Sequence, residues 1–449
     1  MSLERSDYAS RRAELKARVQ ATDSVAPLGL GKRTSNLFRD RRPGRKQALD
    51  LRVFNHVLQV DAADGWVDAE GLTTYEDLVE ATLPAGVMPA VVPQLKTITV
   101  GGAAAGVGIE ASSFRQGLVH ETLLEFDVLL ASGEVVLCTP DNEHRELFYG
   151  FANSYGTLGY ALRLRQRTLP VKSCVRVEHL RYEQPRDFFA ALVEQCGGTV
   201  DFVDGVVFGE HTLVLNAASF VEQAPWRSDY RFERIYYRSL LDKPTDYLTT
   251  CDYLWRWDTD WFWCSKNLGA QWPPIRRLLG RRRLNSRTYQ RVMRWNARWG
   301  ITRRLARLRG GHPETVIQDV DIPVERAEEF LAFLLREIRI LPIWICPLQP
   351  TAGPAEFTLY PLDPHRLYVN FGFWDTVEST AALAPGHFNR LVEQESIRLG
   401  GIKSLYSDSY FTREEFARAY AMPQYEKLKA KYDPGRRLLD LYDKTVLRA

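Results

Sequence analysis

The chain has 449 residues, more than a single domain usually holds, and this length predicts two domains with separate cores. Hydrophobic residues make up 45% and charged residues 26%, which excludes a disordered protein, and no stretch reaches the roughly eighteen apolar residues of a membrane span. The net charge of +3 hides an uneven distribution, because thirteen arginines and no acidic residue lie between Ile275 and Arg309.

The first half of the chain alternates short strand and helix patterns. Residues 1–20 carry alternating charges and suit a helix, within an N-terminal segment 1–24. Two short strands are predicted over 53–61 and 66–71, followed by a helix that has Thr73 or Thr74 as its N-cap and Gly86 as its stop. A glycine-rich stretch then precedes a hairpin over 123–140, which turns at Ser132 and Gly133.

A helix over 142–154, a second glycine turn at 155–160 and a strand over 161–171 complete this part, so we expect one domain over 25–172. From residue 173 to 449, helices alternate with strands that pair with their sequence neighbours, as over 175–183 and in RLYVNFGFW. Such mixing predicts an α+β second domain with an antiparallel sheet.

The cysteines and histidines show no metal-site pattern. Six cysteines are scattered without a CxxC pair, and the eight histidines have no ligand spacing. The N-terminus lacks the apolar core of a secretory signal. We therefore expect reduced thiols in a cytoplasmic protein and no bound metal.

The glycine-rich stretch TITVGGAAAGVGIEASSFRQGL, from Thr97 to Leu118, is the most informative part of the sequence. Closely spaced glycines let backbone N–H groups approach an anion or a flavin without interference from Cβ atoms. The alternative is that these glycines only form turns and close contacts between strands. The stretch is not the dinucleotide fingerprint of a Rossmann unit, because no GxGxxG follows a strand and opens a helix.

The order of the motifs favours cofactor binding. TVGG, GxGIExSS, a strand–SG–strand hairpin, ELFYG and GTLGY follow one another, and VIQDVDIP, PIWICP, YSDSYFTREEF and LYDK come later in the chain. This succession resembles the FAD-linked oxidoreductases of the vanillyl-alcohol oxidase and p-cresol methylhydroxylase superfamily, and within it the Δ24-sterol reductases. The resemblance covers most of residues 85–445 and implies a two-part FAD-binding domain followed by an α+β cap domain whose C-terminal segment returns to the flavin.

The resemblance also implies which residues contact the flavin. They are Thr99, Gly101, Gly102, Gly106, Gly108, Ile109, Ser112, Ser113, Gly117, Gly156, Thr157 and Gly159. The superfamily usually has an RGGG-type pyrophosphate loop near its start, and the nearest equivalent here is GKRTSNLF, which suggests Arg33, Thr34, Ser35 and Asn36. No histidine stands in this segment, so we expect FAD to bind non-covalently. The membrane segment that begins the eukaryotic sterol enzymes is missing, so we expect any membrane attachment to be peripheral.

Seven of the eleven tryptophans lie between Trp255 and Trp299, within a Trp/Arg-rich segment 253–309. Tryptophan prefers the boundary between water and lipid, and each basic residue near an anionic leaflet adds about 1 kcal/mol of attraction. The segment therefore predicts peripheral binding to the inner face of an anionic membrane. Two alternatives remain, since tryptophans commonly fill cores and arginine runs also bind nucleic acid or acidic carrier proteins.

If the substrate is like those of the reductases, its double bond is isolated, so hydride from a reduced flavin has no electrophilic carbon to attack until an acid protonates the alkene. Candidate acids come from the segments most similar to the family: Tyr406, Asp408, Tyr410, Glu414, Glu415 and Tyr442. Each has a structural alternative, because the glutamates suit the first turn of a helix capped by Thr412 and the tyrosines suit a core.

The sequence thus supports an FAD-dependent reductase of a lipid carbon–carbon double bond, with NADPH as electron donor. Suitable substrates are a methylene-branched fatty acyl phospholipid or a Δ24-sterol-like molecule, because protonation of either gives a tertiary cation. One alternative is an oxidase or dehydrogenase of an alcohol or alkyl group. Another is a non-catalytic lipid-binding partner of a lipid methyltransferase. We expect no nucleic-acid partner.

Overall fold

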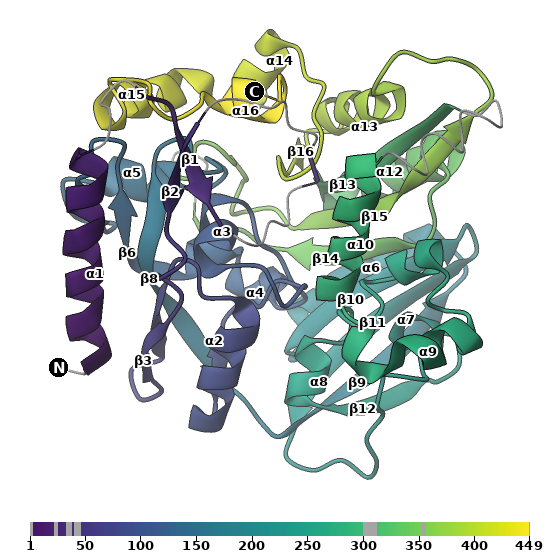
Figure 1. The fold of residues 1–449 in the computed structure, drawn as a ribbon. Coiled ribbons are helices and arrows are strands. Elements are labelled where there is room, and N and C mark those ends of the chain that lie inside the picture. The colour runs from purple at the N-terminus through teal and green to yellow at the C-terminus, as the bar shows by residue number, and fades with distance from the viewer. Residues whose placement is uncertain are drawn as a thin grey trace.

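The computed structural model describes residues 3–21, 26–32, 38–39, 46–299, 312–352 and 356–448. These residues form one six-stranded and one eight-stranded antiparallel sheet, with helices around both (Figure 1). A small parallel pair, β1 (Leu28–Gly31) and β2 (Gln47–Asp50), adjoins the first sheet. The predicted α+β class is confirmed.

The first sheet has the strand order β3-β4-β8-β6-β7, and β5 pairs with the end of β8. Its strands are β3 (Val57–Asp61), β4 (Trp66–Glu70), β5 (Val87–Pro89), β6 (Leu123–Leu129), β7 (Val135–Cys138) and β8 (Tyr160–Pro170). The N-terminal helix α1 (Leu3–Gln20) packs beside it, where the Tyr8 hydroxyl donates to Asp127 at 2.6 Å.

Local signals in the sequence account for several of these elements. Helix α2 (Tyr75–Thr82) begins at Thr74, whose Oγ1 accepts from the backbone N–H of Asp77 at 3.2 Å. The helical stretch ends at Gly86, at a φ of 74° that favours glycine. The predicted hairpin is β6 and β7, with Gly133 in its turn at a φ of 86°. Helix α5 (Arg145–Gly150) lies inside the range predicted for it.

The second sheet has the order β12-β9-β11-β10-β14-β15-β13-β16, and every pair in it is antiparallel. Its strands are β9 (Cys174–Tyr182), β10 (Phe202–Gly209), β11 (Thr212–Val221), β12 (Thr245–Thr249), β13 (His312–Pro323), β14 (Ile343–Leu348), β15 (Tyr368–Ser379) and β16 (Ile402–Lys403). The first sheet thus uses residues before 171 and the second sheet uses residues after 173.

The two faces of the second sheet pack against different partners. On β14, Ile343 and Ile345 point into a core that the helices on one face cover. The alternate residues Trp344 and Cys346 point the other way, into the core shared with the first sheet. The covering helices are α6 (Pro185–Gly197), α12 (Ala327–Phe333) and α13 (His387–Arg398). The face toward the first sheet is therefore the one available to a ligand between the two.

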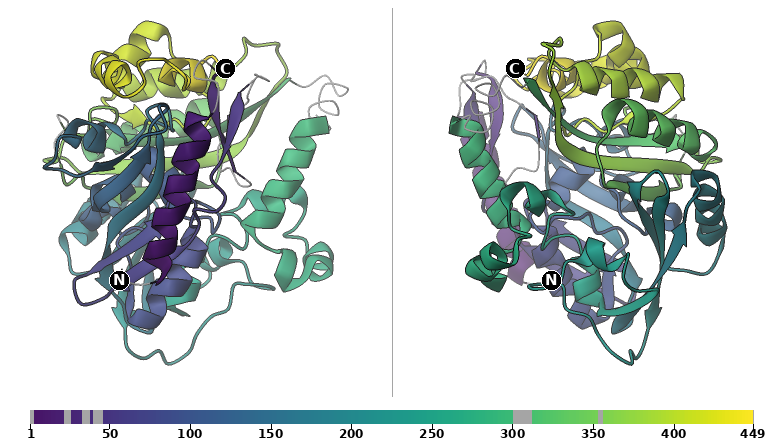
Figure 2. Two further views of the ribbon diagram at one scale, coloured as in Figure 1. Left: turned by 60° about the vertical axis from the view of Figure 1, so that its left-hand side comes forward. Right: turned by 90° about the vertical axis from the view of Figure 1, so that its right-hand side faces the viewer.

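The Trp/Arg-rich segment divides between core and surface. Trp257 and Trp263 are fully buried, and Arg276 is buried in an ion pair with Asp260 at 2.6 Å. The helices in and before this segment are α7 (Tyr236–Ser239), α8 (Thr250–Leu254), α9 (Pro273–Arg283) and α10 (Ser286–Trp299). Helices α9 and α10 lie on the outside of the molecule (Figure 2). The prediction that the whole segment faces a membrane was therefore wrong for its first part, whose tryptophans fill the core.

The C-terminal helices α14 (Arg413–Ala419), α15 (Met422–Tyr432) and α16 (Leu441–Thr445) return to the first sheet (Figure 1). The buried Lys429 Nζ donates to the backbone carbonyl of Thr157 at 2.7 Å, and Lys444 Nζ donates to that of Tyr155 at 2.6 Å. Both carbonyls belong to the second glycine turn, so the last helices fix that turn in place. None of the described helices combines the length and apolarity that crossing a bilayer requires.

Candidate active site

A cavity of about 920 Å³ lies between the two sheets. The glycine-rich segment 98–109 and the turn at 155–161 line one side. Strands β13, β14 and β15, the stretch 261–268 and Tyr406 line the other. The two glycine segments that the sequence singled out therefore border one space, although about fifty residues separate them in the chain.

The glycines on the cavity wall stand where no side chain fits. A Cβ on Gly101 would lie 2.8 Å from the carbonyl oxygen of Gly71, and one on Gly108 would lie 2.6 Å from Cγ2 of Val119. A Cβ on Gly102 would lie 2.7 Å from Oγ1 of Thr99, which accepts the Gly102 N–H at 3.2 Å. The backbone here is held open to the cavity by close packing behind it.

Basic residues border the same end of the cavity. Lys32, Arg39, Lys46 and Lys444 all line it, and Lys32 Nζ lies 3.8 Å from the position of a Cβ on Gly102. The predicted Arg33, Thr34, Ser35 and Asn36 lie outside the described residues, between Lys32 and Lys46. Sequence reasoning chose this loop for its place in the chain and missed the lysines that flank it, which carried no motif of their own.

The other predicted flavin contacts divide into two groups. Those that line the cavity are Thr99, Gly101, Gly102, Gly106, Gly108, Ile109, Gly156 and Gly159. Ser112, Ser113, Gly117 and Thr157 do not line it and instead shape the loops behind it. For example, Ser112 Oγ donates to the Ala90 carbonyl at 2.9 Å, and Thr157 Oγ1 donates to the Ser154 carbonyl at 2.8 Å.

The opposite wall is aromatic. Trp261, Phe262, Trp344 and Trp374 line it, with the Phe262 and Trp374 ring centroids 4.5 Å apart and those of Phe262 and Trp344 5.4 Å apart. Trp261 and Phe262 are consecutive residues at positive φ, 45° and 58°. Bulky residues rarely adopt this conformation, and its strain is tolerated where the surrounding packing imposes it. The wall suits an apolar ligand.

Three acidic residues also line the cavity, Asp319 of β13 and Asp375 and Glu378 of β15, and Asp319 is the one beside the aromatic wall and Tyr406. Burial raises the pKa of its carboxyl to about 7, and the nearby Asp321 adds to this rise. A hydrogen bond with Tyr406 opposes the rise, and the Tyr406 hydroxyl in turn accepts the Trp374 Nε1–H at 2.8 Å. Sequence reasoning missed Asp319, although it lies in VIQDVDIP, one of the motifs that carried the resemblance.

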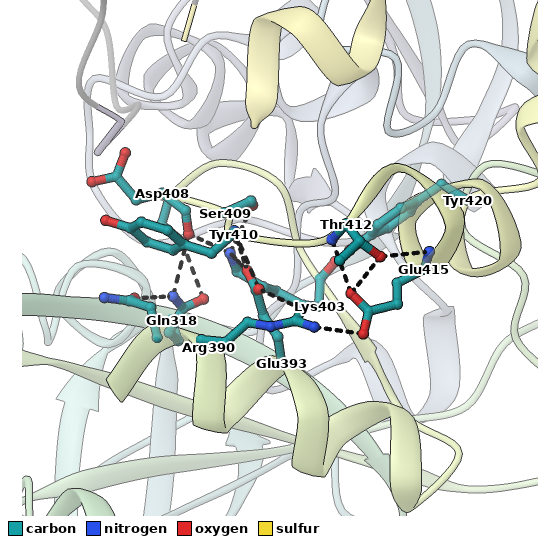
Figure 3. Close-up of polar contacts among 12 residues, drawn as sticks. Gln318, Arg390, Glu393, Lys403, Asp408, Ser409, Tyr410, Thr412, Glu415 and Tyr420 are labelled. Carbon is teal, nitrogen blue, oxygen red and sulfur yellow. Dashed lines mark hydrogen bonds and ion pairs between the residues drawn. The ribbon is translucent and has the colours of Figure 1, made fainter. Parts of the chain in front are cut away.

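Of the predicted acids, only Tyr406 lines the cavity. Figure 3 shows that Glu415 is held by Thr412 and Arg390 instead. It accepts the Thr412 N–H at 2.9 Å and an Arg390 N–H at 2.5 Å, and the hydrogen bond from Arg390 lowers the pKa of Glu415 to about 2. Glu415 therefore forms a capping box with Thr412 at the start of α14, which is the structural alternative given for it from the sequence.

The remaining candidates also have structural contacts away from the cavity. The Tyr410 hydroxyl accepts from Arg448 at 2.6 Å, and Asp408 lies 3.4 Å from the guanidinium of the same arginine. The Tyr442 hydroxyl donates to the Phe411 carbonyl at 3.2 Å. Glu414 is exposed in the first turn of α14. The structure therefore does not bring these side chains to the cavity. Among the described residues, no three His, Cys, Asp or Glu side chains group as metal ligands.

Comparisons with known proteins agree with this geometry. Residues 10–139 match the model of a family described as FAD binding domain. A Δ24-sterol reductase of Arabidopsis thaliana is 25% identical over 90% of this chain and 78% of its own length, and the human enzyme is 25% identical over 86% and 75%. Cytokinin dehydrogenase 7 of rice is 32% identical over 33% of this chain and 29% of its own length.

The fold, the cavity and these matches together define an FAD-linked oxidoreductase whose FAD-binding domain is of the type found in the vanillyl-alcohol oxidase and p-cresol methylhydroxylase superfamily. Within that superfamily, the chain is similar over most of its length to the Δ24-sterol reductases.

The cavity fits FAD on its own geometry. Glycines with no room for a Cβ expose the backbone, as a flavin or a pyrophosphate requires, and four basic side chains stand at the same end to balance the phosphate charges. The cavity volume lies within the range of about 300–1,000 Å³ that holds cofactors and small ligands.

Proposed function

We propose that this oxidoreductase adds two hydrogens across an isolated carbon–carbon double bond in a lipid, using non-covalently bound FAD and NADPH as electron donor. The observation that carries the proposal is a single cavity that joins the basic, glycine-lined end to an aromatic wall. Bound FAD supplies hydride chemistry once it is reduced. The residues of this chain bind the lipid, exclude water and provide a proton.

The substrate class follows from the chemistry of the wall. Most of this wall is apolar ring surface, and two of its three indole N–H groups already have partners: that of Trp344 donates to Asp204 at 3.3 Å and that of Trp374 to Tyr406 at 2.8 Å. An alkene that gives a tertiary cation on protonation suits such a site. A methylene-branched fatty acyl phospholipid and a Δ24-sterol-like molecule both meet this condition, and we favour the phospholipid because of the charge on the adjoining surface.

That surface comprises Trp272, the residue that precedes α9, and the exposed side chains of α9 and α10. Trp272 is 62% exposed, Leu278 80% and Trp295 57%. The exposed arginines Arg282, Arg283, Arg291 and Arg294 surround them on the same two helices. Met293 of α10 lines the cavity, so this helix has one side toward the ligand and another toward solvent. We therefore propose that this face binds an anionic membrane peripherally and receives the acyl chain from it.

The function is tested by two half-reactions under anaerobic conditions. NADPH should bleach the flavin absorbance, and a phosphatidylglycerol with a methylene-branched acyl chain should restore it while the lipid gains two hydrogens in mass. Rapid reoxidation by oxygen, with no reaction of the lipid, would instead support the oxidase alternative. A colourless protein that does not take up FAD would support a non-catalytic partner of a lipid methyltransferase. Yellow colour kept in an acid-precipitated pellet would show a covalent flavin.

Membrane binding is tested by sedimentation with liposomes. The wild-type protein should sediment with phosphatidylglycerol vesicles at low salt and not with phosphatidylcholine vesicles. Replacing Trp272, Leu278 and Trp295 by alanine should reduce the bound fraction without changing the flavin absorbance. The matched control is alanine at Trp226, which is 52% exposed on a different part of the surface. Equal binding by both variants would refute the assignment of this face.

A further inference from the structure

Pairing of β13 with β15 brings an acid and an aromatic ring together on the cavity wall. Asp319 lies opposite Gly372, and side chains at alternate positions of both strands face the cavity. A Cβ on Gly372 would be 2.7 Å from Asp319 Oδ1 and 2.7 Å from Cη2 and Cζ2 of Trp374. The carboxyl of Asp319 and the indole of Trp374 therefore both pack against Gly372, in the space that a side chain there would occupy.

The two aspartates of β13 have different surroundings, although only one residue separates them. Asp321 is satisfied, because its carboxylate accepts the Tyr360 hydroxyl at 2.7 Å and the Asn370 amide at 2.6 Å. Asp319 Oδ1 is buried and has no hydrogen-bond partner among the described residues. A carboxyl placed in this way favours its neutral, protonated form, because nothing compensates an ionised oxygen for the loss of water.

We propose that Asp319 is the proton donor to the lipid double bond, and that the faces of Phe262 and Trp374 stabilise the resulting cation. The proposal rests on the reductase function above. The Asp319 O–H bond breaks as the alkene π electrons form a C–H bond to the less substituted carbon. Asp319 is left as a carboxylate and the more substituted carbon as a tertiary cation. Bound FAD, once reduced, would supply the hydride that the tertiary cation takes up to complete the addition of two hydrogens, and solvent returns a proton to the Asp319 carboxylate.

The aromatic wall is suited to a transient positive charge. Phe262 and Trp374 have ring centroids 4.5 Å apart, and both line the cavity beside the acid. A cation over an aromatic face gains about 0.5–2 kcal/mol, and more where water is excluded. Such a wall stabilises the cation without offering a nucleophile that would trap it.

Tyr406 acts as a positioning residue. Burial raises the pKa of its hydroxyl well above the usual value, which makes it a weaker acid than the adjacent carboxyl. Its oxygen accepts the Trp374 N–H at 2.8 Å, which holds the Tyr406 hydroxyl at the cavity beside Asp319. The Tyr406 hydroxyl favours the ionised form of Asp319 and lowers the Asp319 pKa, whereas the negative charge of Asp321 raises it. The charge of Asp319 also raises the pKa of Tyr155, on the glycine turn, although burial is the main cause of that rise.

The test compares Asp319→Asn with the matched control Asp321→Asn in the two half-reactions. Asp319→Asn should keep its FAD and its reduction by NADPH, but reoxidation by the methylene-branched phospholipid should slow at least about hundredfold, the usual contribution of a general acid. Asp321→Asn should keep both steps. The wild-type reoxidation rate should fall as pH rises through about 7, because only the protonated carboxyl donates. Tyr406→Phe should shift this fall in the reoxidation rate to higher pH, and Asp321→Asn should shift it to lower pH.

A binding measurement separates this proposal from the proposed function. The probe is a phosphatidylglycerol with a dimethylammonium group in place of the branched carbon, which carries a fixed positive charge like that of the cation. Wild-type protein should bind it about tenfold more tightly at pH 8 than at pH 6, as expected for ~1.4 kcal/mol of added attraction to the carboxylate. Asp319→Asn should bind it with no such pH dependence, and Phe262→Leu should weaken binding at both pH values.

Each outcome has a distinct meaning. If the wild-type flavin is never reoxidised by an alkenyl lipid, the reductase function fails, and pH-independent binding of the ammonium lipid would then overturn the role of Asp319 as well. If the lipid reoxidises wild-type protein and Asp319→Asn at the same rate, the function stands and Asp319 is not the donor. If the Asp319→Asn protein does not retain FAD, Asp319→Glu takes its place in these assays. That variant should be reoxidised more slowly than the wild-type protein, and its reoxidation rate should still fall as pH rises.

Discussion

Replacing Asp319 by asparagine should change the pH dependence of stability in a predictable direction. The carboxyl has a pKa of about 7 in the folded protein, against an ordinary value of 3.8. Because burial disfavours the ionised form, the wild-type protein loses stability as pH rises from about 4 to about 7, and the loss is complete above that range. A shift of about three pH units at 1.36 kcal/mol each corresponds to ~4 kcal/mol. Water in the cavity would screen the charge, so this value is an upper limit.

Asparagine has nearly the shape of the protonated acid but does not titrate, so it removes this penalty. We expect Asp319→Asn to match the wild-type protein within about 1 kcal/mol at pH 4.5 and to exceed it by up to ~4 kcal/mol at pH 8. The free energy of unfolding in urea, measured by tryptophan fluorescence, gives both values. Asp64→Asn, in an exposed turn, controls for the change in net charge. A difference that is the same at both pH values would refute the assignment of a buried, neutral carboxyl.

Three further substitutions test the framework of the site. Arg256→Leu leaves two buried carboxylates without the guanidinium that lies 2.7 Å from each, and should cost about 3–5 kcal/mol in urea unfolding. Gly101→Ala should lower the ratio of flavin to protein absorbance, whereas Gly197→Ala, with nothing within 4 Å of its Cβ, should not. Lys429→Met removes the ammonium group 2.7 Å from the buried carboxylate of Asp433, which keeps only its backbone N–H partners, and should cost about 3–5 kcal/mol together with weaker retention of FAD in gel filtration.

Local signals predicted much of the first sheet and little of the acid chemistry. The cap at Thr74, the turn at Gly133 and the glycine stretch each depend on a few adjacent residues, so the sequence alone identified them. The role of Glu415 was also local, because T-x-x-E before an apolar run is a capping box, and the structural alternative was correct. Asp319 depends on which face of β13 meets the cavity. Asp319 and Asp321 alternate with Val320 and Ile322, so the sequence places both aspartates on one face of β13, but what that face meets is set by the pairing of strands far apart in the chain.

The tryptophans show the same limit. Composition favoured a membrane surface for the whole segment, but Trp257 and Trp263 form the core behind the cavity, while Trp272 and Trp295 are exposed. Nothing within the segment distinguishes these two groups, because the difference arises from the strands and helices against which each side chain packs. The arginines divide in the same way, with Arg276 buried beside Asp260 and Arg287, Arg291 and Arg294 of α10 on the surface.

Asp319 also offers a way to separate reduction from oxidation at one site. An enzyme that oxidises an alcohol needs a base to take the hydroxyl proton, and a carboxyl with a pKa near 7 becomes that base as it ionises. Oxidation would therefore accelerate as pH rises through this value, whereas protonation of an alkene would slow. The ionisation of Asp319 thus predicts opposite changes of rate with pH for the two reactions. Because the aromatic wall beside Asp319 suits a cation, we expect a rate that falls as pH rises, as for a reductase.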